Sequence, residues 1–170
     1  MRLATSADIP DIVSLANEVF LIEQFFVEGD RTDPNAVAFM LERGVLLLAL
    51  EGERLVGCVY VHADGPRGYF GMLSVDASMQ GRGLGRRLVE AAEARCREAG
   101  CERMELSVVN VRPELPPFYR HLGYVATGTK PFPVTVYQRL KIPCELIVMA
   151  KPLKAGEAGT PDRTTGAASV

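Results

Sequence analysis

A glycine-rich turn is the most informative chemical feature of this sequence. Three glycines stand at alternate positions in Gln80-Gly81-Arg82-Gly83-Leu84-Gly85-Arg86-Arg87, at the start of a strongly amphipathic segment. Missing Cβ atoms let an anion approach the main-chain N–H groups, and a helix N-terminus adds unpaired donors with a partial charge of about +0.5. The neighbouring arginines add side-chain cations. The turn therefore predicts a binding site for a phosphate or pyrophosphate group.

The spacing of the glycines separates this turn from two common phosphate-binding motifs. A Walker loop, G-x-x-x-x-G-K-S/T, requires a lysine that is missing here, and Arg86 stands where the dinucleotide fingerprint G-x-G-x-x-G has its third glycine. Two other interpretations stay open at this point. The turn could bind a nucleotide or inorganic phosphate in an unrelated α/β protein, or it could be a flexible connection that carries exposed arginines.

The elements that position this turn follow from hydrophobic periodicity. Capping signals predict a helix after Thr5 and Asp8, and a second one with Asp33 as N-cap and Pro34 in its first turn. Further helices are expected from Gly83 to Gly100 and from Pro116 to Gly123. Strands are expected at Val45–Leu50, Leu55–His62, Tyr69–Val75, Glu102–Val109, Tyr124–Thr127 and Cys144–Ala150.

Two further segments indicate how the chain is arranged around the turn, one as a βαβ unit and one as a pocket-lining loop. A strand, a helix and a strand follow one another closely over Tyr69–Val109, which indicates a right-handed βαβ unit with two parallel strands. Leu21–Arg31 is too apolar for a linker and too irregular for a helix, and loops of this kind often line a pocket.

The turn and a downstream segment together resemble the GNAT superfamily of acyl-CoA-dependent N-acetyltransferases. Its signature Q/R-x-x-G-x-G/A is matched by Gln80–Gly85, and its F-Y-x-x-x-G-F/Y segment by Phe118–Tyr124. The resemblance covers residues 1–153. It implies an α/β fold with a mixed, mostly antiparallel sheet, in which the parallel strands Tyr69–Val75 and Glu102–Val109 splay apart to form the acyl-CoA cleft.

The resemblance also implies which residues bind acetyl-CoA. Backbone groups of Leu73 and Val75 would hold the pantetheine arm, and the amides of Gly81–Arg86 would hold the pyrophosphate. Many members have an Asn shortly before the catalytic tyrosine; here Arg112 occupies that position, and Asn110 stands two residues earlier. The expected cofactor-binding residues are Leu73, Ser74, Val75, Gln80, Gly81, Arg82, Gly83, Leu84, Gly85, Arg86 and Asn110.

By the same resemblance, Tyr119 is the expected catalytic residue, which protonates the departing thiolate. A phenol has an ordinary pKa of about 10 and is protonated at neutral pH, so it can donate a hydrogen bond to the sulfur. The alternative is a half-buried tyrosine whose hydroxyl contacts only water or the backbone.

The acceptor amine must lose a proton before it attacks, and a carboxylate can accept that proton. Glu23, Glu28 and Asp30 lie in the irregular segment that the family places over the acceptor cleft. Each could equally be a solvated surface carboxylate. Glu23 and Glu28 are the candidate substrate-site residues.

Composition restricts the partners. The chain has 170 residues, 48% of them hydrophobic and 24% charged, with a formal net charge of -2. These values are typical of one globular domain and predict weak attraction to nucleic acid. No apolar stretch approaches the ~18 residues of a membrane-spanning helix. A small-molecule amine is the default acceptor, although a peptide stays possible, and the resemblance implies that a homodimer is possible.

The remaining features concern metals, location and the chain end. Four cysteines and two histidines show no metal-ligand spacing, so no metal is expected. The N-terminal residues lack the pattern of a secretory signal, and we expect a cytoplasmic protein. Residues 154–170 contain no large apolar residue before Val170 and are predicted to be a disordered tail.

Three functional hypotheses result. The leading one is an N-acetyltransferase that moves an acetyl group from acetyl-CoA to an amine by direct attack. The second is a non-catalytic acyl-CoA-binding sensor or regulatory module. The third is the unrelated nucleotide- or phosphate-binding protein.

Overall fold

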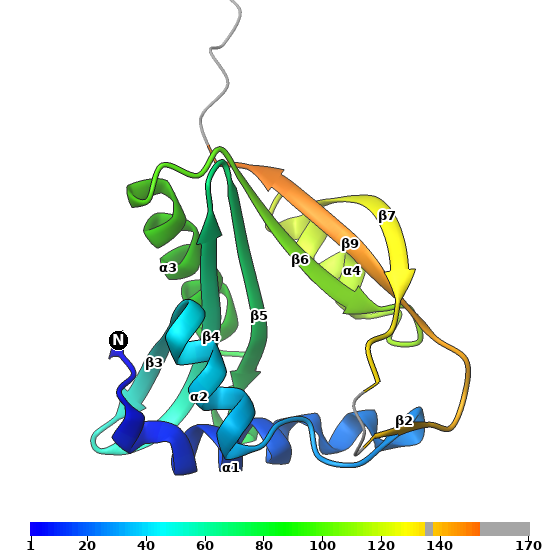
Figure 1. Ribbon diagram of the computed structural model, residues 1–170, viewed down its shortest axis with the longest axis horizontal. Helices are drawn as coiled ribbons and strands as arrows, with labels where there is room; N and C mark the ends of the chain where they lie inside the picture. The colour runs from blue at the N-terminus through cyan, green and yellow to red at the C-terminus, as the bar shows by residue number, and fades with distance from the viewer. Residues whose placement is uncertain (135–137, 154–170) are drawn as a thin grey trace, which may run out of the picture.

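The computed structural model describes residues 1–134 and 138–153, which fold around a seven-stranded sheet (Figure 1). Within these residues β5 and β6 pair in parallel, and the other neighbouring strands are antiparallel. The predicted mixed, mostly antiparallel sheet is therefore confirmed. From edge to edge the strands are β1 (Arg2–Leu3), β3 (Val45–Glu51), β4 (Arg54–Asp64), β5 (Arg67–Val75), β6 (Arg103–Val109), β9 (Glu145–Pro152) and β7 (Val125–Pro131).

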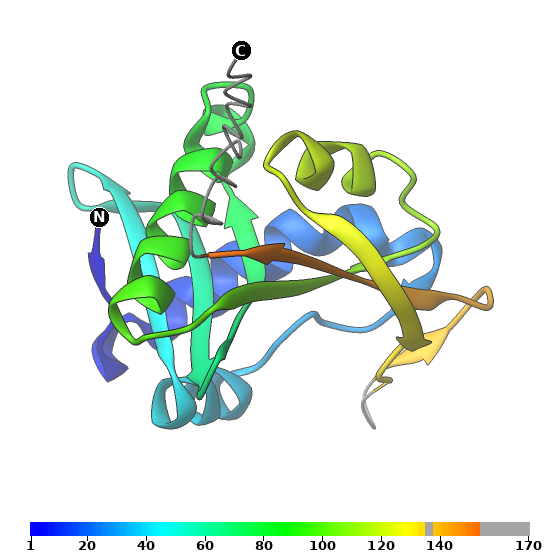
Figure 2. The ribbon, with the colours of Figure 1, turned by 90° about the horizontal axis from the view of Figure 1, so that it is seen from above.

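Helices cover both faces of the sheet (Figures 1 and 2). Because successive strand residues point to opposite faces, β3 sends Leu46 and Leu48 into the core beneath α1 and α2, and Leu47 and Ala49 into the core beneath α3 and α4. The helices match the four that periodicity predicts. They are α1 (Ile9–Val19), preceded by a 3₁₀ turn over Ser6–Asp8, α2 (Pro34–Arg43), α3 (Leu84–Glu98) and α4 (Leu115–His121).

The start of α2 shows how local sequence sets a boundary. The carboxylate of Asp33 accepts hydrogen bonds from the N–H groups of Asn35 at 2.8 Å and Ala36 at 3.0 Å, which have no partner inside the helix. At the other end, Gly44 has a negative φ. A Cβ there would overlap the carbonyl of Val61, so this glycine allows the helix to end close to β4.

The parallel strands diverge soon after they begin. Pairing between β5 and β6 extends only from Arg67 opposite Arg103 to Tyr69 opposite Glu105. Beyond that point β5 stays with β4, and β6 follows β9 over its whole length. Figure 1 shows the resulting V between β5 and β6. The predicted splay of this pair is therefore present.

The segment after α1 contains structure that periodicity misses. Phe20–Phe25 forms a 3₁₀ helix, and β2 (Val27–Glu28) pairs with β8 (Arg139–Leu140) in a second, two-stranded sheet. The partners in this sheet are more than a hundred residues apart, so no local pattern signals them. No helix in the described part of the chain is long and apolar enough to span a bilayer. The predicted tail, 154–170, lies outside the described residues.

Candidate active site

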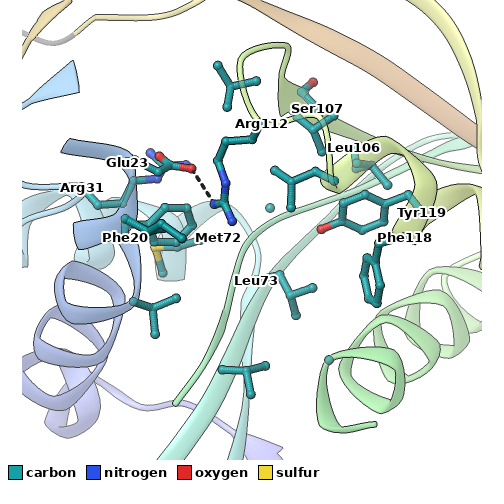
Figure 3. A pocket seen from close by; sticks show the side chains of 18 of the residues that line it. Phe20, Glu23, Arg31, Met72, Leu73, Leu106, Ser107, Arg112, Phe118 and Tyr119 are labelled. Atoms are coloured by element: carbon teal, nitrogen blue, oxygen red, sulfur yellow. Dashed lines mark hydrogen bonds and ion pairs between the residues drawn. The ribbon is translucent and has the colours of Figure 1, made fainter. Parts of the chain in front are cut away.

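A cleft of about 610 Å³ opens where β5 and β6 part. Its residues come from the end of α1, the 3₁₀ helix that follows, the C-terminal halves of β5 and β6, the start of α3, and α4. Figure 3 looks into the cleft, with Tyr119 and Phe118 on one side and Phe20, Glu23 and Arg31 on the other.

The cleft edge of β5 carries main-chain groups that do not bond to β4. The N–H of Asp76 donates to the carbonyl of Val56 at 2.9 Å, and hydrogen-bonded pairs alternate along antiparallel strands. The N–H and C=O of Val75 therefore point away from β4, and so does the C=O of Leu73, which shares a peptide plane with the N–H of Ser74 opposite Cys58. Consistent with this direction, Gln80 Nε2 donates to the Val75 carbonyl at 3.1 Å. Leu73, Val75 and Gln80 all line the cleft.

A β-bulge precedes this edge. Gly71 pairs with Tyr60 and Ser74 with Cys58, so Met72 and Leu73 together oppose one residue of β4. Met72 has φ 50°, in the left-handed region that residues other than glycine seldom adopt. Bulges bend a strand and often lie next to active sites. The Ser74 side chain is fully buried, and its hydroxyl donates to the Met72 carbonyl at 3.3 Å.

The glycine-rich turn lies between β5 and α3. Gly81 and Gly83 have φ 73° and 76°, and a Cβ at either would meet no atom within 4 Å. The turn therefore needs glycine for its backbone conformation and leaves the main chain open to solvent. The ladder of α3 begins with Arg87 N–H donating to Gly83 at 3.1 Å, so the preceding amides of the first turn have no intrahelical acceptor.

The side chains of the turn have different environments. Arg82 and Arg86 are exposed, and Arg86 Nε lies 2.8 Å from Glu90. Leu84 is buried in the core beneath α3. Gly85 lines the cleft, where a Cβ would lie 3.8 Å from the Phe118 ring.

Tyr119 projects from α4 into the cleft. The residue is only 7% exposed, and no side-chain hydrogen bond is found for its hydroxyl among the described residues. Figure 3 shows the hydroxyl directed into the cleft, between Arg112 and Leu73. Burial raises the pKa of Tyr119 well above its ordinary value, against the opposing effect of Arg112. The phenol is therefore a protonated donor at neutral pH.

A buried ion pair faces Tyr119. Glu23, in the 3₁₀ helix, lies 3.2 Å from Arg112, which also contacts Glu114 at 2.8 Å. Burial raises the pKa of Glu23, while Arg31 and Arg112 act in the opposite direction. Sequence reasoning named Glu23 but gave no role to Arg31 or Arg112, which both line the cleft.

Not all of the candidate residues line this cleft, and Asn110 and Glu28 have partners elsewhere. The Asn110 side chain accepts a hydrogen bond from the Glu145 N–H at 3.0 Å, at the end of the β6–β9 pairing. Glu28 is exposed and pairs with Arg139 at 2.9 Å on the small sheet. In the described ranges, no three His, Cys, Asp or Glu side chains gather as a metal site would require.

Comparison with known proteins gives consistent matches. The model of the acetyltransferase (GNAT) family matches residues 11–124. The rice (Oryza sativa subsp. japonica) protein glucosamine 6-phosphate N-acetyltransferase 1 is 36% identical over 78 residues, which are 46% of this chain and 46% of that protein. The chain spans about half the length of the curated relatives it matches.

Solved structures match over most of their length. The Escherichia coli ribosomal-protein-S18-alanine N-acetyltransferase superposes with a TM-score of 0.72 at 18% identity, covering 92% of this chain and 96% of that one. A Salmonella typhimurium acetyltransferase structure with acetyl-CoA has a TM-score of 0.68 at 20% identity, covering 94% and 96%. These structures share the fold. The match of the family model to residues 11–124, well over half of the sequence, shows that the chain belongs to the GNAT acetyltransferase family.

Proposed function

We propose that residues 1–153 form an N-acetyltransferase domain that transfers an acetyl group from acetyl-CoA to the amine of a small molecule or peptide. The observation that carries this proposal is that Leu73 and Val75 of β5, Gln80 and Gly85 of the glycine turn, and Tyr119 all line one cleft. The non-catalytic sensor that the sequence leaves open is not favoured, because the family match is to acetyltransferases.

The residues of the cleft fit acetyl-CoA. The left-handed backbone at Gly81 and Gly83 leaves main-chain donors uncovered, as a diphosphate requires. We assign the pyrophosphate to the amides of Gly81–Arg86 and the pantetheine amides to Leu73 and Val75. Gln80 braces the turn against β5 through its bond to Val75. The packing of Ser74, Leu84 and Asn110 supports a structural role for these three residues.

The chemistry divides among three groups. When bound, acetyl-CoA supplies the thioester whose carbonyl carbon the amine attacks. Glu23, directly or through water, accepts the proton that the ammonium must lose, and burial keeps its pKa above the ordinary range. Tyr119 donates its proton to the sulfur as the carbon–sulfur bond breaks. The ion pair with Arg112 holds the Glu23 carboxylate at the acceptor side of the cleft.

The test is turnover with a panel of amines. The purified chain is incubated with acetyl-CoA and amines that include glucosamine 6-phosphate, glucosamine, simple alkylamines and short peptides, and the free CoA thiol is measured. We expect amine-dependent release of the thiol for at least one class. CoA binding by calorimetry without thiol release for any class would contradict the proposal.

The location and assembly of the protein stay predictions. We propose a cytoplasmic protein without a nucleic acid partner, and a homodimer is the assembly to test first by light scattering. These points rest on the sequence and on the family resemblance.

A further inference from the structure

Arg31 and Arg112 both line the cleft, but they differ in whether a carboxylate pairs with them. Arg112 is held by Glu23 and Glu114. No carboxylate of the described residues lies within ion-pair distance of Arg31. A guanidinium has five N–H donors in a planar fork that matches a carboxylate or phosphate. Arg31 lines the cleft and is exposed, so its guanidinium has bonding capacity available to a ligand that enters.

Contacts of Arg31 and of its chain neighbours restrict its position. Its guanidinium carbon lies 4.8 Å from the centre of the Phe20 ring, a cation–π contact. The next residue, Thr32, is clamped to α1 by two 3.0 Å hydrogen bonds between its main chain and the Asn17 side chain. On the other side, the Asp30 carbonyl accepts a bond from Gln138 at 3.1 Å. This anchoring reduces the entropy that Arg31 would lose on binding a ligand.

Arg31 stands on the acceptor side of the cleft. Figure 3 shows it beside Glu23, across the cleft from Tyr119. Glu23 can take a proton from an amine, while the Arg31 fork can bind an anion. A substrate that satisfies both groups carries an amine and an anionic oxygen group in one small molecule.

We propose, on the basis of the acetyltransferase function above, that the acceptor is an anionic primary amine and that Arg31 binds its carboxylate or phosphate. Phe20 supports the guanidinium from behind, and Glu23 receives the amine end. An amine without an anionic group would leave the Arg31 guanidinium hydrogen-bonded only to water. A diamine would place a second positive charge against Arg31. The cleft therefore favours amines in the order anionic, neutral, dicationic.

The experiment compares matched amines with the full chain and acetyl-CoA. The probes are 3-aminopropanoate, 3-aminopropyl phosphate, 3-aminopropanol and 1,3-diaminopropane, with kcat/KM measured by thiol release. The variants are Arg31→Gln, Arg31→Lys, and Arg43→Gln as control. Arg43 stacks on Phe39 at 5.4 Å in the same manner but does not line this cleft.

We expect kcat/KM to be higher for the two anionic probes than for the neutral one. Comparison of the carboxylate probe with the phosphate probe shows which anion Arg31 binds better. Arg31→Gln should reduce the anionic-to-neutral ratio about 10- to 100-fold, mainly through KM, because it removes a charge-assisted pair. Arg31→Lys should recover part of this ratio, and Arg43→Gln should keep it. An unchanged ratio in Arg31→Gln, or preference for the neutral or dicationic probe, overturns the inference alone. If the chain binds CoA but none of the amines causes thiol release, the acetyltransferase function is overturned as well.

Discussion

The guanidinium of Arg112 lies 3.2 Å from the carboxylate of Glu23, although 89 residues separate them in the chain. Their side chains are only 17% and 9% exposed. Arg112 follows β6, whereas Glu23 follows α1, so the pair connects two walls of the cleft. Breaking such a buried pair leaves an uncompensated charge. The pair therefore positions the proposed base, and Arg112, together with Arg31, opposes the rise in its pKa that burial causes.

Removing Arg112 should change the pH dependence of the reaction. Arg112→Gln takes away a positive charge and a donor that lower the pKa of Glu23, so this pKa rises further above its ordinary value. Glu23 is then deprotonated only at higher pH, and the acidic limb of the kcat/KM profile should move to higher pH. Glu23→Gln should remove this limb and lower kcat by about 100-fold or more.

Glu114 provides a control, because its removal should change the pKa of Glu23 in the opposite direction. Its negative charge raises the pKa of Glu23, and it contacts Arg112 from the exposed side. Glu114→Gln should therefore move the acidic limb to lower pH. If Arg112→Gln and Glu114→Gln shift the limb in the same direction, Glu23 is not the group that titrates.

Two neighbouring tyrosines should separate catalysis from stability. Tyr119 and Tyr124 have ring centres 6.2 Å apart, but the Tyr119 hydroxyl faces the cleft (Figure 3), whereas the Tyr124 hydroxyl bonds to the buried Glu93. Tyr119→Phe should lower kcat by about 10²- to 10⁴-fold through loss of the proton donor. Because that hydroxyl has no protein partner among the described residues, CoA affinity and unfolding free energy should stay close to those of the parent. Thiol-release kinetics, calorimetry and urea denaturation measure the three quantities.

Tyr124→Phe is the matched variant. The Tyr124 hydroxyl donates to the buried Glu93 at 2.9 Å, and Glu93 also binds Lys151 and Arg97. Its removal should lower the unfolding free energy by about 1–3 kcal/mol, because the bond goes to a charged group, while turnover by the folded fraction persists. Equal losses of turnover in both variants would remove the special role of Tyr119.

The glycine that borders the cleft should show opposite effects on stability and affinity. Gly85 lies in the first turn of α3, and an added Cβ would make ordinary contacts at 3.8 Å with Phe118 and Val75. Gly85→Ala should therefore raise stability by about 0.5 kcal/mol through helix propensity. The same methyl group should weaken CoA binding, since it covers the main chain that we assign to the pyrophosphate. Unchanged CoA affinity by calorimetry would place the pyrophosphate elsewhere.

Much of the fold could be predicted from local signals. The cap of Asp33, the alternation of β3 and the long amphipathic stretch of α3 each depend on residues close in sequence, and each gave the correct element. The glycine turn could be found for the same reason, because its backbone conformation requires specific residues at fixed spacing. The parallel pair followed from the order of the elements around α3.

The long-range contacts on the acceptor side could not be predicted in this way. The contacts of Glu23 with Arg112 and of β2 with β8 join distant segments, and their residue types are common on any surface. Glu28 and Glu23 are equivalent candidates by sequence, but of the two only Glu23 lines the cleft. The sequence places Leu21–Arg31 and Glu23 near a pocket, but the role of Arg112, which replaces the expected Asn, depends on the fold that brings it opposite Glu23.

The N-terminal turn before α1 should make stability depend on pH. The Asp8 carboxylate lies 2.6 Å from Arg2 and accepts the Thr5 N–H at 2.7 Å, and these bonds hold the pKa of Asp8 well below its ordinary value. A lowered pKa in the folded state stabilises the protein above the unfolded-state value of about 4, and this contribution declines as the pH falls below it. Asp8→Asn should therefore cost about 1 kcal/mol at pH 7 and less near pH 3. Asp11→Asn, in the first turn of α1, is the control. Urea denaturation at several pH values measures the unfolding free energy of both variants. A loss of unfolding free energy in Asp8→Asn that does not change with pH would contradict this account.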